Sequence, residues 1–310
     1  MPRLVRLPPA LHEPFSVAQA RAAGVGYGRT RSADLISPFH GVRSRADAPV
    51  ADSREKRIAD RARLYLPRLS DGQFFCEATA CALFGLPLPW QEHDDVVHVG
   101  VAPPRRAPRT RGVVGHQLLS DRLDLRLEVT MPVCSPLDAW RQCAARMTVV
   151  DLIVLGDALV RRKFPLVTPE QLTSYVGAHA GYPGVARLGR ALTLIRPGTD
   201  SPKESQVRLI IVRHGMPEPE VNSPVRDSNG GFLGLGDLVL EKWKIVIEYD
   251  GGYHFASDEQ IHADIDRLAR FTAAGWTAIR VHKYHLRNPA NLAARVREAL
   301  ERAGWRPSES

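Results

Sequence analysis

The alternation of hydrophobic and polar residues divides the chain into three regions. The first contains small helical stretches, a short extended piece and a polar linker at residues 46–54. The second contains helices around short alternating segments that are typical of strands. The third reads as a helix, three extended segments, a second helix, a strand and a final helix. We therefore predict an α+β protein of several domains, at residues 1–50, 51–198 and 199–310.

The first region has the outline of a helix-turn-helix with a wing. Ser16 is a typical N-cap for a helix that ends at Gly24, and a glycine turn leads into a basic helical stretch at residues 29–36. Pro38 ends that stretch, and residues 39–43 follow as a small strand. DNA phosphates or base edges would then meet three basic side chains: Arg29, Arg31 and Arg43. The alternative is a pair of small helices that pack elsewhere, with solvated arginines.

The middle region predicts an α/β domain. Helices are expected at residues 55–66, 74–84, 136–145, 149–162 and 169–178, and strands at residues 96–101, 113–118 and 125–129. Three aspartates on these helices are interpreted as caps or surface residues: Asp138, Asp151 and Asp157. Two strand histidines, His98 and His116, are interpreted as ordinary packing residues. The four cysteines show no spacing that is typical of a zinc site.

The third region predicts a mixed sheet in the order αβββαβα. The elements are expected at residues 201–212, 220–225, 232–240, 245–247, 257–274, 276–281 and 289–303. An Asn-Gly pair between the first two strands is a strong hairpin signal. The third strand is a continuous apolar run, which indicates a central strand buried on both faces. Because a helix joins the third strand to the fourth, these two strands should be parallel.

Acidic residues follow this predicted sheet. Asp237 lies on the second strand, and Glu248 and Asp250 lie at the end of the third, where alternation places both on one face. A Gly-Gly pair then allows a sharp turn, and His254 follows it. Carboxylates that converge on one point suit Mg²⁺, a hard cation that takes oxygen ligands. The alternative gives each acid a local role, with Asp237 and Asp250 in turns and Glu204 in a capping box.

Residues 200–303 resemble a Vsr-like endonuclease domain of the PD-(D/E)XK nuclease superfamily. The resemblance rests on motifs in the expected order: Asp237, Ile245-Val-Ile-Glu248-Tyr-Asp250-Gly251, His254, Asp264-Ile-Asp-Arg267, Gly275-Trp276 and Ile279-Arg-Val281. It matches Glu204 to the glutamate of the first helix, Asp237 to the metal-binding aspartate and Glu248 to the (D/E) position. Asp250 stands where the superfamily has lysine. Vsr-like members also lack that lysine and use other residues, histidine among them, so His254 is expected to assist.

The first two regions are similar to actinobacterial proteins that join an AbiEi-type antitoxin region to this nuclease-like domain. The likeness rests on residues 15–43 and 76–87, mostly at apolar and glycine positions. It favours DNA binding by the N-terminal winged helix.

The nuclease resemblance implies a Mg²⁺- or Mn²⁺-dependent DNA endonuclease or nickase, with a role in defence or DNA repair. Glu204 or Asp250 would assist the expected metal ligands, which are two carboxylates and a backbone carbonyl: Asp237, Glu248 and Tyr249. Arg267 would contact nucleic acid or brace the site by pairing with Asp264. Two alternatives stay open: a catalytically inactive DNA-binding regulator or antitoxin on a nuclease-like scaffold, and a nuclease that acts on RNA.

Charge and composition agree with a nucleic-acid partner. The 310-residue chain has a net charge of +8, much of it from arginine, and a basic protein attracts polyanions. No apolar run approaches the roughly 18 residues of a membrane span, and the N-terminus lacks a signal-peptide core. We therefore expect a cytoplasmic protein with no membrane partner. The expected protein partner is a second copy of the chain or a protein of the toxin–antitoxin type, and the sequence leaves that choice open.

Overall fold

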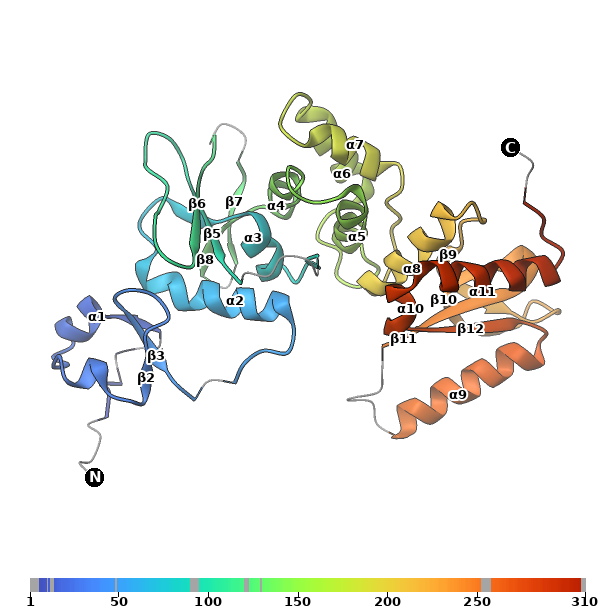
Figure 1. Cartoon of the computed structure of the whole chain (residues 1–310), viewed down its shortest axis with the longest axis horizontal. Helices are drawn as coiled ribbons and strands as arrows, with labels where there is room; N and C mark the ends of the chain where they lie inside the picture. Colours follow the sequence, from blue (N-terminus) through green and yellow to red (C-terminus); the bar gives the residue numbers. More distant parts are fainter. Residues whose placement is uncertain are drawn as a thin grey trace. The chain divides into compact units, whose positions relative to one another are not determined.

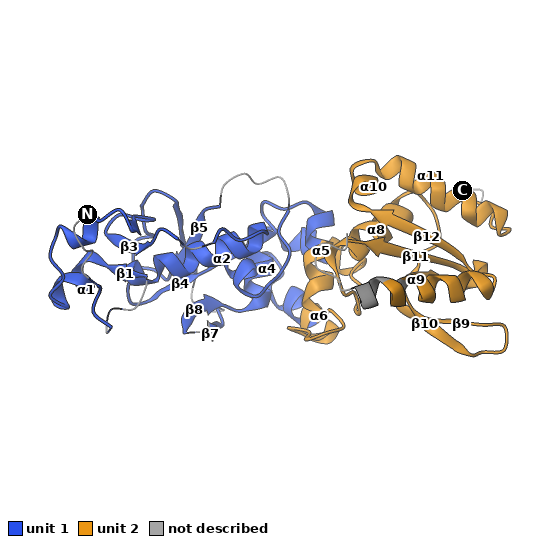
Figure 2. Ribbon diagram, turned by 90° about the horizontal axis from the view of Figure 1, so that it is seen from below, with its two compact units in different colours: residues 1–152, 174–189 blue, residues 153–173, 190–310 orange. Residues whose placement is uncertain are grey.

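A computed structural model describes residues 6–9, 11, 14–47, 49–89, 95–119, 123–128, 130–251 and 258–307. The chain forms two compact units (Figure 2). Unit 1 comprises residues 1–152 and 174–189, and unit 2 comprises residues 153–173 and 190–310. Helices surround three separate sheets (Figure 1), which confirms a mixed α+β architecture. Within the described residues, no helix is both long and apolar enough to cross a bilayer.

The start of unit 1 is a small three-stranded antiparallel sheet in the order β1-β3-β2. Its elements are β1 (Phe15–Ser16), α1 (Val17–Ala22), η1 (Arg29–Arg31), β2 (Leu35–Ile36) and β3 (Val42–Arg45). The predicted N-cap is confirmed, because the Ser16 hydroxyl accepts from the Gln19 N–H at 3.1 Å. The predicted second helix is wrong: residues 29–36 contain only a 3-10 turn and a two-residue strand. Arg29 pairs with Asp34 five positions later, a spacing that an α-helix does not place on one face.

The rest of unit 1 is built on a five-stranded sheet in the order β6-β5-β4-β8-β7. Its elements are α2 (Arg54–Tyr65), η2 (Leu66–Arg68), β4 (Gln73–Phe75), α3 (Glu77–Leu83), β5 (Val97–Val101), β6 (Val113–Gln117), β7 (Leu125–Glu128), β8 (Met131–Cys134) and α4 (Pro136–Cys143). The three predicted strands are confirmed. The helix predicted to begin at Phe74 begins later, because Phe74 and Phe75 are buried in the central strand of the sheet.

Three helices carry the chain from one unit to the other: α5 (Val149–Leu159), α6 (Pro169–Ala178) and α7 (Val185–Leu192). Within unit 2, Asp157 of α5 is fully buried and accepts from Arg208 at 2.9 Å, and the Arg208 side chain is also fully buried. The interpretation of Asp157 as a cap or surface residue is therefore wrong. Asp138 is buried as well and accepts from Tyr175 at 2.6 Å, whereas Asp151 bonds to Thr148 as a cap does.

Unit 2 contains the predicted mixed sheet, in the order β12-β11-β10-β9. Its elements are α8 (Pro202–Arg213), β9 (Glu220–Arg226), β10 (Phe232–Leu240), η3 (Glu241–Trp243), β11 (Ile245–Asp250), α9 (Asp258–Ala273), β12 (Thr277–His282), α10 (Lys283–Arg287) and α11 (Pro289–Arg302). The hairpin of β9 and β10 and the parallel pairing of β11 with β12 are confirmed. Helix α10 is an addition to the predicted order. At the edge, β9 contains Pro224 and a left-handed residue, Asn222.

Strand β11 is central and buried on both faces, as predicted. On one face, Ile245 and Ile247 belong to a core that includes residues of α8 and α11. On the other face, Val246 packs in a second core with Phe271 of α9. We call this second side the α9 face of the sheet. Alternation along β11 therefore directs Glu248 and Asp250 to the α9 face.

Candidate functional site

Asp237 and Glu248 are neighbours across β10 and β11. The antiparallel register pairs Leu238 with Ile247, so one step further along the two strands Asp237 faces Glu248. The backbone N–H of Asp237 lies 3.4 Å from Glu248 Oε1, and the N–H of Tyr249 donates to Asp237 Oδ2 at 2.8 Å. The structure thus confirms that two acids from adjacent strands meet on one face. Tyr249 contacts Asp237 through its N–H, and a metal-binding role for its carbonyl stays a prediction.

Burial and the neighbouring carboxylate change the acidity of Asp237. Burial is the main cause that raises the pKa of Asp237 to about 7, and the negative charge of Glu248 is the next. Glu204 adds to the effect, while the Tyr249 N–H and the Arg267 charge oppose it. A strongly perturbed carboxylate beside a second carboxylate is typical of catalytic and cation-binding sites.

Arg267 of α9 neutralises Glu248. Its guanidinium donates to Glu248 Oε2 at 2.7 Å and to Oε1 at 3.1 Å, and it also donates to the carbonyl of Leu235 at 2.7 Å. Such two-pronged pairing fixes the orientation of a carboxylate. Arg267 therefore belongs to the acid site, and its predicted contact with nucleic acid would be made from there. The side chain of Asp264, its predicted partner, lies outside the described residues.

Asp250 is paired with residues of the parallel strand β12. Arg280 donates to Asp250 Oδ2 at 3.0 Å, and His282 Nδ1 lies 3.5 Å from the same oxygen. The parallel register aligns Glu248 with Arg280 and Asp250 with His282. Sequence reasoning missed Arg280 and His282 as site residues. The sequence does contain the pattern that predicts them. Arg280 and His282 alternate with the buried Ile279 and Val281, and the helical crossover places their strand beside β11.

Glu204 lies at the start of α8, where the carboxylate has local partners. It accepts from the Asp200 N–H at 2.9 Å and from Asn222 Nδ2 at 2.9 Å, while its own N–H donates to Ser201 Oγ at 3.2 Å. Burial raises the pKa of Glu204, and the charge of Asp200 adds to this rise. No set of three acidic side chains among the described residues converges closely enough for one ion. The structure brings Asp237 and Glu248 together, and His254 lies outside the described residues.

The three arginines predicted to contact DNA have partners within unit 1. Arg29 forms a two-pronged pair with Asp34, and Arg43 donates to Ser37 and to backbone carbonyls, including that of Thr30. Both stabilise the turn between α1 and β3. Arg31 is exposed and lies over the ring of Tyr27, 5.2 Å from its centroid. Of the three, Arg31 has the most exposed position for a phosphate contact.

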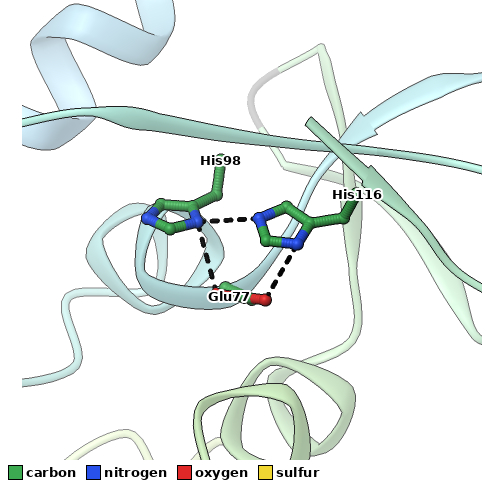
Figure 3. A group of neighbouring side chains, drawn as sticks. All are labelled: Glu77, His98 and His116. Carbon is green, nitrogen blue, oxygen red and sulfur yellow. Dashed lines mark hydrogen bonds and ion pairs between the residues drawn. The ribbon is translucent and has the colours of Figure 1, made fainter. Parts of the chain in front are cut away.

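Unit 1 contains a second cluster of titratable side chains: Glu77, His98 and His116 (Figure 3). His98 Nδ1 lies 2.9 Å from His116 Nε2 and 3.3 Å from Glu77 Oε2, and His116 Nδ1 lies 3.0 Å from Glu77 Oε1. The two histidines, which the sequence presents as ordinary packing residues, therefore lie in direct contact with each other and with Glu77. The register pairs His98 with Val114 on neighbouring parallel strands, so His116 lies on the same face as His98, two residues along.

The ionisation of this cluster follows from its burial and charges. Burial lowers the pKa of His116, Glu77 opposes this, and His98 and Arg146 contribute to the lowering. Burial alone would raise the pKa of Glu77, but the hydrogen bond from His98 and the nearby charges of His116, His98 and Arg146 lower it overall. The neighbouring basic groups thus favour the ionised form of Glu77, whereas burial favours the neutral form of His116.

Comparisons with known proteins give distant relatives. The chain is 27% identical over 232 residues to the uncharacterized protein MT2308 of Mycobacterium tuberculosis strain CDC 1551 / Oshkosh, across 74% of this chain and 81% of that protein. The same figures apply to the uncharacterized protein Rv2248 of strain ATCC 25618 / H37Rv. No family model matches the chain. No solved structure matches it either.

Proposed function

We propose that the protein is a divalent-metal-dependent DNA endonuclease or nickase whose site lies on the α9 face of unit 2. The observation that carries the proposal is the Asp237–Glu248 pair, in which burial and, next, the negative charge of the neighbouring Glu248 raise the pKa of Asp237 to about 7. A divalent cation would relieve this repulsion. The motif resemblance of residues 200–303 and the net charge of +8 support DNA as the substrate.

The donors at this site fit Mg²⁺ or Mn²⁺. Mg²⁺ is commonly bound through one or two carboxylates and completes its shell with water and substrate phosphates. Asp237 and Glu248 supply two carboxylates on adjacent strands. A bound divalent ion supplies Lewis acidity, which offsets charge on phosphate oxygens and makes water more acidic. No zinc-type ligand is required at this site.

The surrounding residues hold the two acids in place. Arg267 fixes Glu248, and the Tyr249 N–H fixes Asp237. Arg280 fixes Asp250 at 3.0 Å, so the position where the superfamily has lysine holds a paired acid. His282 Nδ1 lies 3.5 Å from Asp250 on the same face of the sheet. We assign Arg280 and His282 as positioning residues.

The proposal is tested by relaxation of supercoiled plasmid in Mg²⁺ or Mn²⁺. We expect the wild-type chain to nick the plasmid, and Asp237→Asn and Glu248→Gln to reduce the rate at least about 100-fold. Glu241→Gln is the matched control, because Glu241 is an exposed acid just before the start of β11. Nicking by Asp237→Asn at the wild-type rate would overturn the proposal. Parallel reactions with matched single-stranded RNA distinguish an RNA-directed nuclease.

A DNA-binding regulator or antitoxin on a nuclease-like scaffold is the second candidate. It is favoured by one observation: both oxygens of Glu248 already accept from Arg267, as a purely structural ion pair would. This candidate predicts salt-sensitive binding to an operator sequence and no cleavage with any divalent ion. A gel-shift assay and the plasmid assay on the same preparation therefore separate the two functions.

A further inference from the structure

We propose that Glu77, His98 and His116 form a binding site in unit 1 for one zinc-class divalent ion, independent of the acids of unit 2. The three residues come from three elements that unit 1 packs together: the start of α3, strand β5 and strand β6. Their side chains point toward one another (Figure 3). Among the described residues this is the one group of three acidic, histidine or cysteine side chains with ligand atoms within 4.8 Å of one another.

The distances suit tetrahedral ligation. Zinc bonds of about 2.0–2.1 Å to nitrogen or oxygen place neighbouring ligand atoms roughly 3.3–3.4 Å apart. His98 Nδ1 lies 2.9 Å from His116 Nε2 and 3.3 Å from Glu77 Oε2. The two imidazole nitrogens would move apart by a few tenths of an ångström to accept an ion, and one ligand atom from each of the three residues lies within 4.8 Å of the other two. The arrangement also places two imidazole nitrogens, His98 Nδ1 and His116 Nε2, opposite each other. A cation bound between them would stabilise this arrangement.

The backbone around the cluster is held in an unusual conformation. Glu77 has a φ of +46°, in the left-handed region that non-glycine residues rarely adopt. Its N–H donates to Gln142 Oε1 at 3.0 Å, and the N–H of His98 donates to Thr79 Oγ1 at 2.8 Å. Such strained residues concentrate at functional and ligand-binding sites. The contacts from Gln142 and Thr79 orient the ligand-bearing residues, as outer-shell groups do in metal centres.

The donor set selects the type of ion. Two imidazoles and one carboxylate suit zinc and other transition metals, whereas Mg²⁺ prefers oxygen ligands alone. Three protein ligands leave one position for water or another donor. The side chains of Glu77, His98 and His116 are 11%, 7% and 11% exposed, so the cluster is enclosed without being sealed from solvent.

The charged group that faces the cluster is Arg146, whose Nη1 lies 3.5 Å from Glu77 Oε2. A bound cation would repel this guanidinium. The Arg146 side chain is 54% exposed, so it can turn into solvent when the ion binds. The competing explanation is a hydrogen-bond network in which His98 donates to His116 and His116 donates to Glu77. That network binds no metal, and zinc binding therefore decides between the two explanations.

The test uses the full chain, stripped with EDTA, dialysed and titrated with Zn²⁺ by calorimetry, with metal content measured by mass spectrometry. We expect one Zn²⁺ per chain, and a melting temperature that rises by roughly 5–10 °C when Zn²⁺ is at about 100 times its Kd. His98→Ala and His116→Ala should weaken binding by more than roughly 100-fold. Circular dichroism in EDTA establishes that each variant folds.

Two controls locate the ion. His40→Ala removes an exposed histidine of unit 1, and Asp237→Asn alters the acid pair of unit 2, so both should retain one Zn²⁺ per chain. X-ray absorption at the zinc edge of the wild-type protein should show two imidazole ligands, a readout that does not depend on any variant. Less than about 0.1 Zn²⁺ per chain, a spectrum without imidazole ligands, or undiminished affinity in both histidine variants would overturn the site.

Discussion

The guanidinium of Arg267 on α9 donates hydrogen bonds to both carboxylate oxygens of Glu248 on β11, at 2.7 and 3.1 Å. Glu248 is almost fully buried, with its side chain 8% exposed. It therefore depends on this guanidinium for neutralisation, because a buried charge without a partner is unfavourable. The same charge opposes the rise in the pKa of Asp237. Arg267 thus influences both acids of the proposed active site.

We predict that Arg267→Met lowers the free energy of unfolding by about 1–3 kcal/mol, because Glu248 loses its partner. Mg²⁺ or Mn²⁺ should then stabilise the variant more than the wild type, since the ion would replace the missing positive charge. Thermal melting with and without the ion measures both effects. Arg270→Met is the control on the exposed side of α9. Equal stabilisation of variant and wild type by the ion would contradict the prediction.

Stability should depend on pH through Asp237. The pKa of this carboxyl is about 7 in the folded chain against an ordinary value of 3.8, so the folded state holds a proton that the unfolded state releases. Its contribution to stability is fully present below about pH 4 and is lost as the pH rises through about 7. The Asp237→Asn variant has no carboxyl group at this position and therefore lacks this pH dependence.

We therefore expect Asp237→Asn to become more stable relative to the wild type as the pH rises. The difference between their free energies of unfolding should grow by roughly 2–4 kcal/mol between pH 4 and pH 8. Urea denaturation across this range measures it. Saturating Mg²⁺ should reduce the growth, because the ion competes with the proton. A difference that stays constant with pH would show that Asp237 titrates normally.

The buried pair of Arg208 and Asp157 predicts a large effect on stability. Arg208→Leu leaves Asp157 without its guanidinium partner in a fully buried position, and we expect a loss of about 3–5 kcal/mol in the free energy of unfolding. Arg213→Leu, on an exposed position of the same helix, should cost less than about 0.5 kcal/mol. Adding Asp157→Leu to Arg208→Leu should recover part of the loss. A double variant less stable than Arg208→Leu would argue against this account.

Arg31 predicts a measurable change in DNA binding. We expect Arg31→Ala to weaken binding to duplex DNA and to reduce the slope of log K against log salt by about 0.9, the effect of one lost phosphate contact. Arg29 is paired with Asp34, so Arg29→Ala should act mainly through the stability of the turn. Fluorescence anisotropy at several salt concentrations measures the slope. An unchanged slope for Arg31→Ala would remove the N-terminal turn from the DNA interface.

The sequence predicted unit 2 well because its signals are local and mutually consistent. The apolar run of β11, the Asn-Gly hairpin and the helix between β11 and β12 each restrict the topology, and together they place Asp237 beside Glu248. The partners of these acids were harder to foresee. The pairing of Arg267 with Glu248 depends on how α9 packs on the sheet, and sequence spacing does not determine that packing.

Unit 1 contains further features that the sequence did not predict. His98 and His116 are 18 residues apart on strands whose parallel pairing was not predicted, and Glu77 belongs to a helix whose start was placed too early. Their convergence is visible only once the strand order is known. The second helix predicted at residues 29–36 failed for a related reason, since the Arg29–Asp34 pair stabilises a turn that helical periodicity does not describe.

The edge strand β9 has a consequence for association. A free edge with regular spacing of donors and acceptors invites an additional strand from another molecule. Pro224 has no N–H to offer, and Asn222, with a φ of +46°, turns the backbone away from the regular extended path. The row of donors along this edge is therefore interrupted at its centre. The sheet that carries Asp237 and Glu248 is thereby protected against fibre-like growth along β9.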